Sequence, residues 1–297
     1  MAARVSLRAN VCYSTDPHAI GWWRMQRKVL GLLMLVVGVL VVSVATLDAH
    51  ELFLKPFAFF VTPGSDARLR ILNGTFEKSE NAIARNRLRD LSVVGPAGIA
   101  HPDTSAWSDK GDTSVFVFRT GAAGTYIVGA STLPRTLRLD AKAFNEYLAS
   151  DGVTDMLDAR KRSNEMNTPS HERYSKHVKT VIQVGDARTP GFDAVLNYPA
   201  EIVPLDNPYA TKVGGVVRAR VLVDGRPVAN QLVIAGGRTP SGARLAVSNV
   251  RSGQDGVARV TIGSPGYWYI KFIHMVPVTG DSVNYESKWA TLTFQVR

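Results

Sequence analysis

From residue 50 onward, apolar and polar positions follow the pattern of short β-strands separated by turns. The apolar runs are rich in β-branched and aromatic residues, and segments such as Gly95-Pro96-Ala97-Gly98 lie between them. This spacing of strands and turns is typical of antiparallel sandwiches of the immunoglobulin-like kind. The expected strands cover residues 58–61, 67–72, 90–94, 114–118, 124–130, 179–184, 215–223, 231–235, 243–247, 257–262, 267–275 and 289–296.

The pattern changes between residues 140 and 167, where charged residues alternate with apolar ones at a wider spacing. Phe144, Tyr147 and Leu148 stand at helical intervals, and Asp151-Gly152 interrupts the series. Apolar residues three and four positions apart indicate one face of an amphipathic helix. We therefore expect two short helices, inserted into the first of two sandwiches.

The segment 201–208 contains two prolines and marks the expected domain boundary. It predicts a first β-sandwich domain over residues 50–205, which carries the helical insertion 140–167, and a smaller one over residues 209–297. The expected fold class is mainly β, with two antiparallel β-sandwich domains preceded by an apolar signal helix.

A long apolar run, residues 29–47, precedes the first expected strand. Met25-Gln26-Arg27-Lys28 gives it a basic start, and Leu47-Asp48-Ala49 ends on a small residue. This is the layout of a secretory signal peptide. We expect translation to start at Met25, residues 1–49 to be an upstream extension plus signal peptide, and cleavage to precede His50. The apolar run is also near the length of a membrane span. In the alternative interpretation, it is therefore not cleaved off, and residues 29–47 anchor the chain in the inner membrane.

Charge and cysteine content narrow the function classes. From His50 onward, 30 basic and 23 acidic residues remain, a net charge of +7, and they are scattered along the chain. No basic block with interleaved aromatic residues occurs, so nucleic-acid binding is not expected. Weak attraction to an anionic envelope surface is the expected consequence of the charge. Cys12 lies in the upstream extension, which leaves the mature chain without cysteine.

His50 is the leading metal-ligand candidate. A chain that starts with histidine carries an α-amine and an imidazole on one residue, and both can chelate one ion. His274 continues the apolar face of Trp268, Ile270 and Phe272. If the last two strands form a hairpin that pairs Ile270 with Ala290, His274 lies opposite Glu286.

The predicted metal ligands are therefore His50, His274, Glu286 and Glu51. Nitrogen ligands of this kind suit nickel, cobalt, copper or zinc, and the intrinsic affinity order does not select among them. In the alternative interpretation, His274 and Glu286 form a hydrogen-bonded pair at the end of a core. We expect His101, His171 and His177 to be surface or hydrogen-bonded histidines.

Motifs of catalysis are missing from the sequence. It contains no Gly-x-Ser-x-Gly elbow, no His-Glu-x-x-His helix and no P-loop, and the mature part offers no cysteine nucleophile. A non-enzymatic protein is therefore expected.

Several stretches resemble one exported family, the domain of unknown function 4198, which is described as the periplasmic component of cobalt/nickel-type transport systems. They are residues 49–56 (AHELFLKP), 172–176 (ERYSK), 200–205 (AEIVPL), 207–208 (NP), 266–270 (GYWYI) and 285–294 (YESKWATLTF). The resemblance implies a periplasmic, all-β protein linked to transition-metal uptake, with a membrane transporter component as its partner. It also implies a second domain similar to carboxypeptidase regulatory-like sandwiches.

Three functions follow as expectations. The first is a periplasmic protein that binds nickel or cobalt for uptake. The second is a sandwich module that binds a cell-wall glycan or a protein partner, with Trp268, Tyr267 and Tyr269 as its platform. Exposure of Tyr267 and Tyr269 beside a concave face would favour it. The third is a copper-site protein, because an amino-terminal histidine with a second histidine can form a redox-active copper site.

Overall fold

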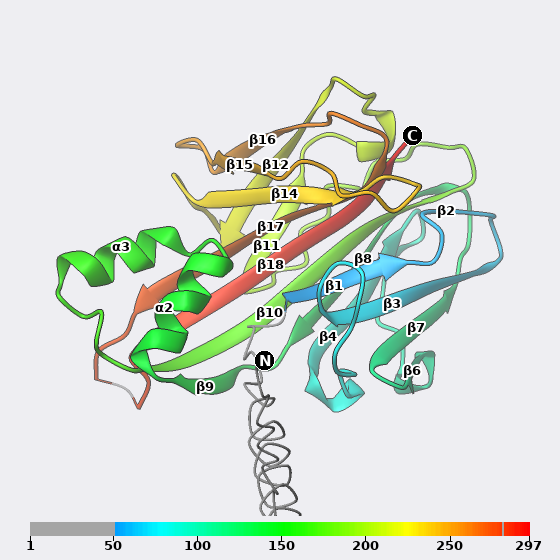
Figure 1. Ribbon diagram of the computed structural model, residues 1–297. Coiled ribbons are helices and arrows are strands. Elements are labelled where there is room, and N and C mark those ends of the chain that lie inside the picture. The colour runs from blue at the N-terminus through cyan, green and yellow to red at the C-terminus, as the bar shows by residue number, and fades with distance from the viewer. Residues whose placement is uncertain (1–50, 281) are drawn as a thin grey trace, which may run out of the picture. The chain divides into compact units, whose positions relative to one another are not determined.

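Strands dominate the part of the chain that the computed structural model describes, residues 51–280 and 282–297 (Figure 1). The expected signal segment, the start at Met25, the cleavage and His50 itself fall on residues 1–50 and lie outside the described residues. The described residues belong to one compact unit. The mainly β fold class is confirmed. No helix among the described residues is long and apolar enough to cross a membrane.

The strands of the described residues form three sheets, which are named the first, the central and the third sheet. The first sheet has the order β1 (Glu51–Pro56), β3 (Asp66–Gly74), β7 (Thr113–Arg119), β6 (Trp107–Lys110). The central sheet has the order β15 (Ser248–Arg251), β14 (Leu232–Arg238), β17 (Gly266–Pro277), β18 (Tyr285–Val296), β10 (Ser170–Val184), β8 (Gly124–Thr132), β4 (Leu88–Gly95), β5 (Gly98–Ala100), and β2 (Phe60–Val61) and β9 (Arg135–Leu139) also pair with β10. The third sheet contains β11 (Ala200–Pro204), β12 (Val216–Val223), β13 (Arg226–Pro227) and β16 (Val257–Thr261). Short 3-10 turns lie at η1 (Arg85–Arg87), η2 (Thr104–Ala106) and η3 (Pro208–Ala210).

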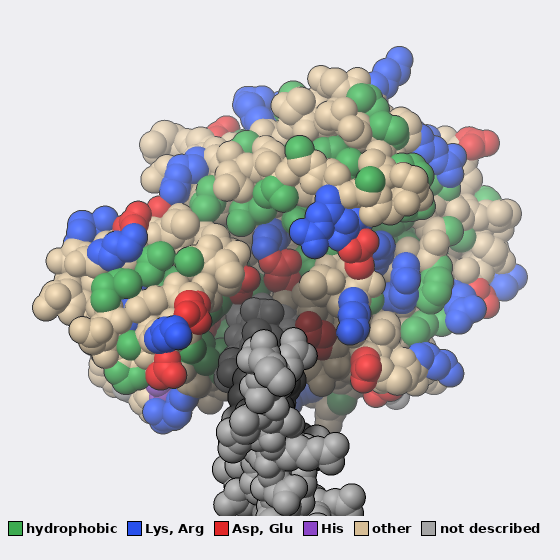
Figure 2. Space-filling view, viewed as in Figure 1, with side chains coloured by type: hydrophobic (Ala, Val, Ile, Leu, Met, Phe, Trp, Pro, Cys, Tyr) green, Lys and Arg blue, Asp and Glu red, His purple; other side chains and the backbone are tan. Residues whose placement is uncertain are grey.

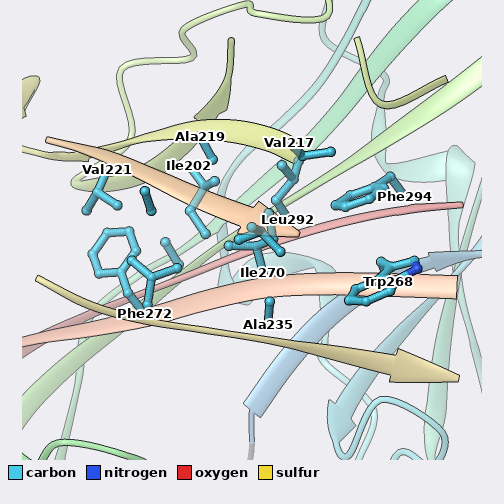
Figure 3. Packing of buried hydrophobic residues seen from close by; sticks show 14 of the residues in the cluster. Ile202, Val217, Ala219, Val221, Ala235, Trp268, Ile270, Phe272, Leu292 and Phe294 are labelled. Carbon is cyan, nitrogen blue, oxygen red and sulfur yellow. The ribbon is translucent and has the colours of Figure 1, made fainter. Parts of the chain in front are cut away.

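The central sheet is buried on both faces at β10. Val181 and Ile182 are neighbours in β10 and therefore point to opposite sides of the sheet. Val181 packs in the core that faces the third sheet, with Ile202 and Leu292 among its members (Figure 3), whereas Ile182 packs in the core that faces the first sheet. Burial on both faces explains why β10 is continuously buried from residue 175 to residue 184.

Strands from both sides of the expected boundary at 205–209 meet in the central sheet. β10 pairs with β18 in parallel, from Glu172 beside Tyr285 to Thr180 beside Thr293. β18 in turn forms an antiparallel hairpin with β17. The sheet thus joins the two predicted halves along one hydrogen-bonded ladder.

The predicted register of that hairpin is wrong by two residues. Phe272, not Ile270, lies opposite Ala290, and His274 lies opposite Lys288 instead of Glu286. A shift of two positions leaves every side chain on its predicted face, so the apolar pattern does not distinguish the two registers. The observed pairing lets both strands run to the hairpin end, from Pro277 to Tyr285.

The two predicted short helices are confirmed as α2 (Ala141–Ser150) and α3 (Thr154–Arg162). The Asp140 side chain accepts a hydrogen bond from the Ala143 amide and caps α2. The break requires Gly152, which has φ of +78° and whose added Cβ would lie 2.4 Å from Ile234 Cδ1. The apolar face of the helices packs on the hairpin end of β17 and β18.

Candidate functional site

The first strand, β1, is fixed on all sides. Leu52 and Leu54 lie in the core between the first and central sheets, while Phe53, on the other face of the strand, packs against Phe76. The outer edge of β1 faces β18, where Thr291 Oγ1 donates to the Leu52 carbonyl over 2.9 Å and the Thr293 hydroxyl donates to the Leu54 carbonyl. Side-chain hydroxyls therefore take the place of a neighbouring strand along this edge.

A cavity of about 420 Å³ opens where β1 begins. Its aromatic floor is made of Phe53, Phe76 and Tyr269, whose ring centroids lie 5.2 to 5.4 Å apart. The volume falls in the range of small-molecule sites, which is about 300–1,000 Å³.

The charged side chains around this floor are sorted by sign onto two walls. The basic wall consists of Arg238 in β14, Arg244 in the segment after β14, and Lys271 in β17. The acidic wall consists of Glu51 in β1, Glu77 and Glu80 in the segment after β3, and Asp151 after α2. Figure 2 shows basic and acidic side chains gathered in the middle of this face, between the positions of β14 and β1 in Figure 1.

Two ion pairs join the walls, Lys271 with Glu51 and Arg238 with Glu77. Burial lowers the pKa of Lys271 to about 8, while the adjoining Glu51 carboxylate favours its charged form. A lysine of this kind can lose its proton near neutral pH at moderate cost.

The predicted ligands do not all meet at one place. Glu51 lies in the cavity wall, and His50 lies outside the described residues. His274 lies on the other face of β17 from Lys271, and its Nδ1 is 3.0 Å from Gln231 Oε1. Glu286 shares the face of His274, where Arg173 lies 3.2 Å from its carboxylate.

These placements separate His274 and Glu286 from Glu51. Burial, with a smaller contribution from the Lys288 ammonium, lowers the pKa of His274. Within residues 51–280 and 282–297, no three His, Cys, Asp or Glu side chains converge where a metal ion could be held.

A second polar cluster faces the third sheet, beside a groove of about 580 Å³. The buried His177 ring lies between two hydroxyls, with Ser131 Oγ 2.8 Å from Nδ1 and Ser175 Oγ 3.0 Å from Nε2. Burial lowers the pKa of His177 to about 3. In the same groove Tyr198 donates to Asp90 over 2.6 Å. His177 is therefore a neutral, hydrogen-bonded core histidine.

No sequence pattern predicted Arg238, Arg244 and Lys271 as site residues. They stand in three segments of ordinary strand or turn composition, and no spacing connects them to Glu77 or Glu80. The resemblance was the one signal that included part of the site, because its first stretch, 49–56, contains β1 (Glu51–Pro56). The stretches 172–176 and 285–289 also meet, since they pair in β10 and β18.

Fold and site together define a mainly β protein with a charge-lined cavity beside its first strand. The chain belongs to the family called domain of unknown function (DUF4198), which matches residues 47–276. Residues 285–294, which carry part of the resemblance, lie beyond the matched range. No curated protein matches the chain.

Among solved structures, the chain is similar to one described as FdeC, a broadly conserved Escherichia coli adhesin. The identity is 13%, the match covers 84% of this chain and 65% of that chain, and the TM-score is 0.21. A likeness at this level carries no argument about what the present chain does.

Proposed function

We propose that the protein is exported and captures a divalent transition metal, nickel or cobalt, for a membrane transporter component. The metal would bind at the amino terminus that cleavage before His50 creates. One observation supports this most: the strand that follows His50 starts with Glu51 in the wall of the charged cavity. The resemblance to a metal-uptake family supplies the choice of metal.

The proposed ligands are the α-amine and imidazole of His50 and the carboxylate of Glu51. Consecutive α-carbons are about 3.8 Å apart, so a chain that starts at His50 begins one residue from the cavity wall. Such a nitrogen and oxygen set suits nickel, cobalt, copper and zinc. The proposal leaves out His274 and Glu286, which lie on the opposite face of the central sheet from Lys271.

Lys271 would be the competitor of the metal. It pairs with Glu51, so an incoming cation must displace its ammonium. Metal binding should release protons from the α-amine and the imidazole, and affinity should fall as the pH drops through about 7 to 6.

Calorimetric titration of protein that starts at His50 tests the proposal, with Ni²⁺, Co²⁺ and Cu²⁺ as probes. His50→Ala, and separately a Gly-Ser extension that blocks the α-amine, should each weaken binding at least a hundredfold. His101→Ala is the matched control, because its side chain is 62% exposed and pairs with Asp90 away from the cavity. Unchanged affinity in His50→Ala contradicts the proposal.

The position of the amino terminus needs its own measurement. Mass spectrometry of the protein secreted by its host should find His50 as the first residue. A membrane-bound form that still contains residues 29–47 would support the anchored alternative and remove the chelate.

A binding module is the second candidate, and one observation favours it. Tyr269 forms part of the floor of a concave cavity, as that hypothesis requires, while the neighbouring Tyr267 stacks on Phe59 with ring centroids 5.8 Å apart. Of the expected platform residues, Trp268 is buried in the core that faces the third sheet. The platform is therefore reduced to Tyr269 with Phe53 and Phe76.

A further inference from the structure

We propose that the cavity beside β1 binds a small dipolar organic molecule, namely an amino acid or the end of a short peptide with a flat apolar side chain. The carboxylate would lie on the basic wall, the ammonium on the acidic wall and the side chain on the aromatic floor. This inference goes beyond the metal proposal and uses only described residues between Glu51 and Lys271.

The separation of charge is the first argument. Among the described residues of the lining, the cations come from β14, the segment after it and β17, and the carboxylates come from β1, the segment after β3 and the residue after α2. The two sets meet in the ion pairs of Lys271 with Glu51 and of Arg238 with Glu77, so groups of opposite sign lie side by side in the cavity. A ligand that carries both a positive and a negative group is stabilised at each of them.

Arg244 is the second argument. The side chain is exposed at the basic wall, and within residues 51–280 and 282–297 it has no carboxylate within ion-pair distance. Lys271 and Arg238 each already hold a carboxylate of the acidic wall. The planar guanidinium of Arg244 can therefore take a ligand carboxylate in a two-point contact.

The acidic wall supplies the complementary end. Glu80 and Asp151 both line the cavity, and an ionised carboxylate has about four lone-pair sites, so it can accept from a ligand ammonium in addition to protein groups. Among the described residues, the lining holds four carboxylates and three cations. A simple anion has no partner among the carboxylates, whereas a dipolar molecule has a partner for each of its two charges.

The floor selects the side chain. Phe53 is fully buried and Phe76 is 6% exposed, so the two rings are held in place below the cavity. Tyr269, which is only partly buried, supplies the accessible aromatic surface above them, and its hydroxyl lies over Gly236, where an added Cβ would be 2.6 Å from the hydroxyl oxygen. A ring held rigidly from below can bind a flat apolar group through offset and edge contacts.

Calorimetry with L-phenylalanine as the probe, in the presence of EDTA, tests the inference. The two matched probes are 3-phenylpropanoate, which lacks the amine, and 2-phenylethylamine, which lacks the carboxylate. We expect saturable binding of L-phenylalanine to the chain that starts at His50, and at least tenfold weaker binding of each analogue.

Variants locate the site. Arg244→Ala should weaken the binding of L-phenylalanine at least tenfold and leave the binding of 2-phenylethylamine unchanged. Glu80→Gln should weaken the binding of L-phenylalanine and of 2-phenylethylamine, which both carry an ammonium, but not that of 3-phenylpropanoate. Tyr269→Leu should weaken all three probes. Arg259→Ala is the control, because Arg259 is exposed on β16 of the third sheet, outside the cavity. Arg244→Lys, which keeps the charge, should retain part of the affinity and shows that the loss is not one of folding.

Three results would overturn the inference: no saturable binding of L-phenylalanine, equal binding of the analogues, or full affinity in Arg244→Ala. His50→Ala separates this inference from the metal proposal. It should abolish metal binding and leave L-phenylalanine binding intact, and loss of the latter would overturn the assignment to residues 51–271.

Discussion

Two lysines of the central sheet form ion pairs with glutamates, and their surroundings differ. Lys179 lies 2.8 Å from Glu201 between the central and third sheets, with the two side chains 2% and 1% exposed. Lys271 pairs with Glu51 at the cavity wall, where the side chains are 12% and 17% exposed. Lys179 also donates to the Ala194 carbonyl, and Glu201 accepts from the Leu196 amide.

This difference in exposure distinguishes an ion pair that supports the fold from one whose partners a ligand or water can replace. Lys179 and Glu201 have two hydrogen-bond partners each and are almost fully buried, so their role is to satisfy each other inside the core. Lys271 and Glu51 border an open cavity in which water or a ligand can replace either partner. One lysine–glutamate pair thus supports the core, and the other borders the proposed binding surface.

The largest expected effect is on stability when Lys179 is changed to Met. Loss of one partner leaves Glu201 as an uncompensated buried charge, which typically costs about 3–5 kcal/mol. Urea unfolding should show this loss, and the double variant with Glu201→Leu should recover much of it. A loss below about 1 kcal/mol would contradict the structural role of the pair.

The next largest effect concerns pH and His177, which lies on the same face of β10 as Lys179. Its pKa is lowered to about 3 in the folded protein, against about 6.5 in the unfolded chain. The unfolded chain therefore binds a proton first as the pH falls, and stability is lost between about pH 6.5 and 3, by an amount on the order of 4 kcal/mol. Urea unfolding at several pH values should show a shallower loss in His177→Gln than in the unaltered protein.

A smaller effect is expected from Lys271→Met at the cavity. Glu51 is 17% exposed, against 1% for Glu201, so it regains some water, and the stability loss should be about 1–3 kcal/mol, smaller than that of Lys179→Met. Burial lowers the pKa of Lys271 from 10.5 to about 8, so the unfolded chain holds more protons between these values and stability rises with pH across that window. Urea unfolding should show that Lys271→Met gains less stability between pH 8 and 10 than the unaltered protein does. A loss as large as that of Lys179→Met would remove the distinction between the two pairs.

The smallest effect on stability is expected for Arg244→Ala. Exposed side chains without specific contacts usually change stability by about 0.5 kcal/mol or less. The thermal midpoint should therefore stay close to that of the unaltered protein, measured by calorimetry, while the binding changes described above appear. A clear fall in the midpoint would indicate that Arg244 supports the fold.

Local patterns in the sequence predict the strands and helices well. The spacing of Phe144, Tyr147 and Leu148 and the break at Gly152 correctly indicate α2 and α3. Alternation in β17 correctly indicates the face of Trp268, Ile270 and Phe272. The same alternation cannot fix the register, because two registers that differ by two residues expose the same faces.

Long-range pairing could not be predicted. The parallel ladder of β10 and β18 joins residues more than a hundred positions apart, and no local pattern encodes it. The cavity depends on that ladder, since it brings β17 with Tyr269 and Lys271 beside β1. Its walls therefore combine segments whose charges look ordinary in the sequence.

The hydroxyls of Thr291 and Thr293 hold the edge of the first strand, β1, by hydrogen bonds to its carbonyls. A strand at the start of a chain commonly frays, and its open edge invites a second chain or an exopeptidase. Here the carbonyls of that edge are already engaged, and its side chains alternate between two cores. Proteolytic trimming from the amino end should therefore stall at the beginning of β1.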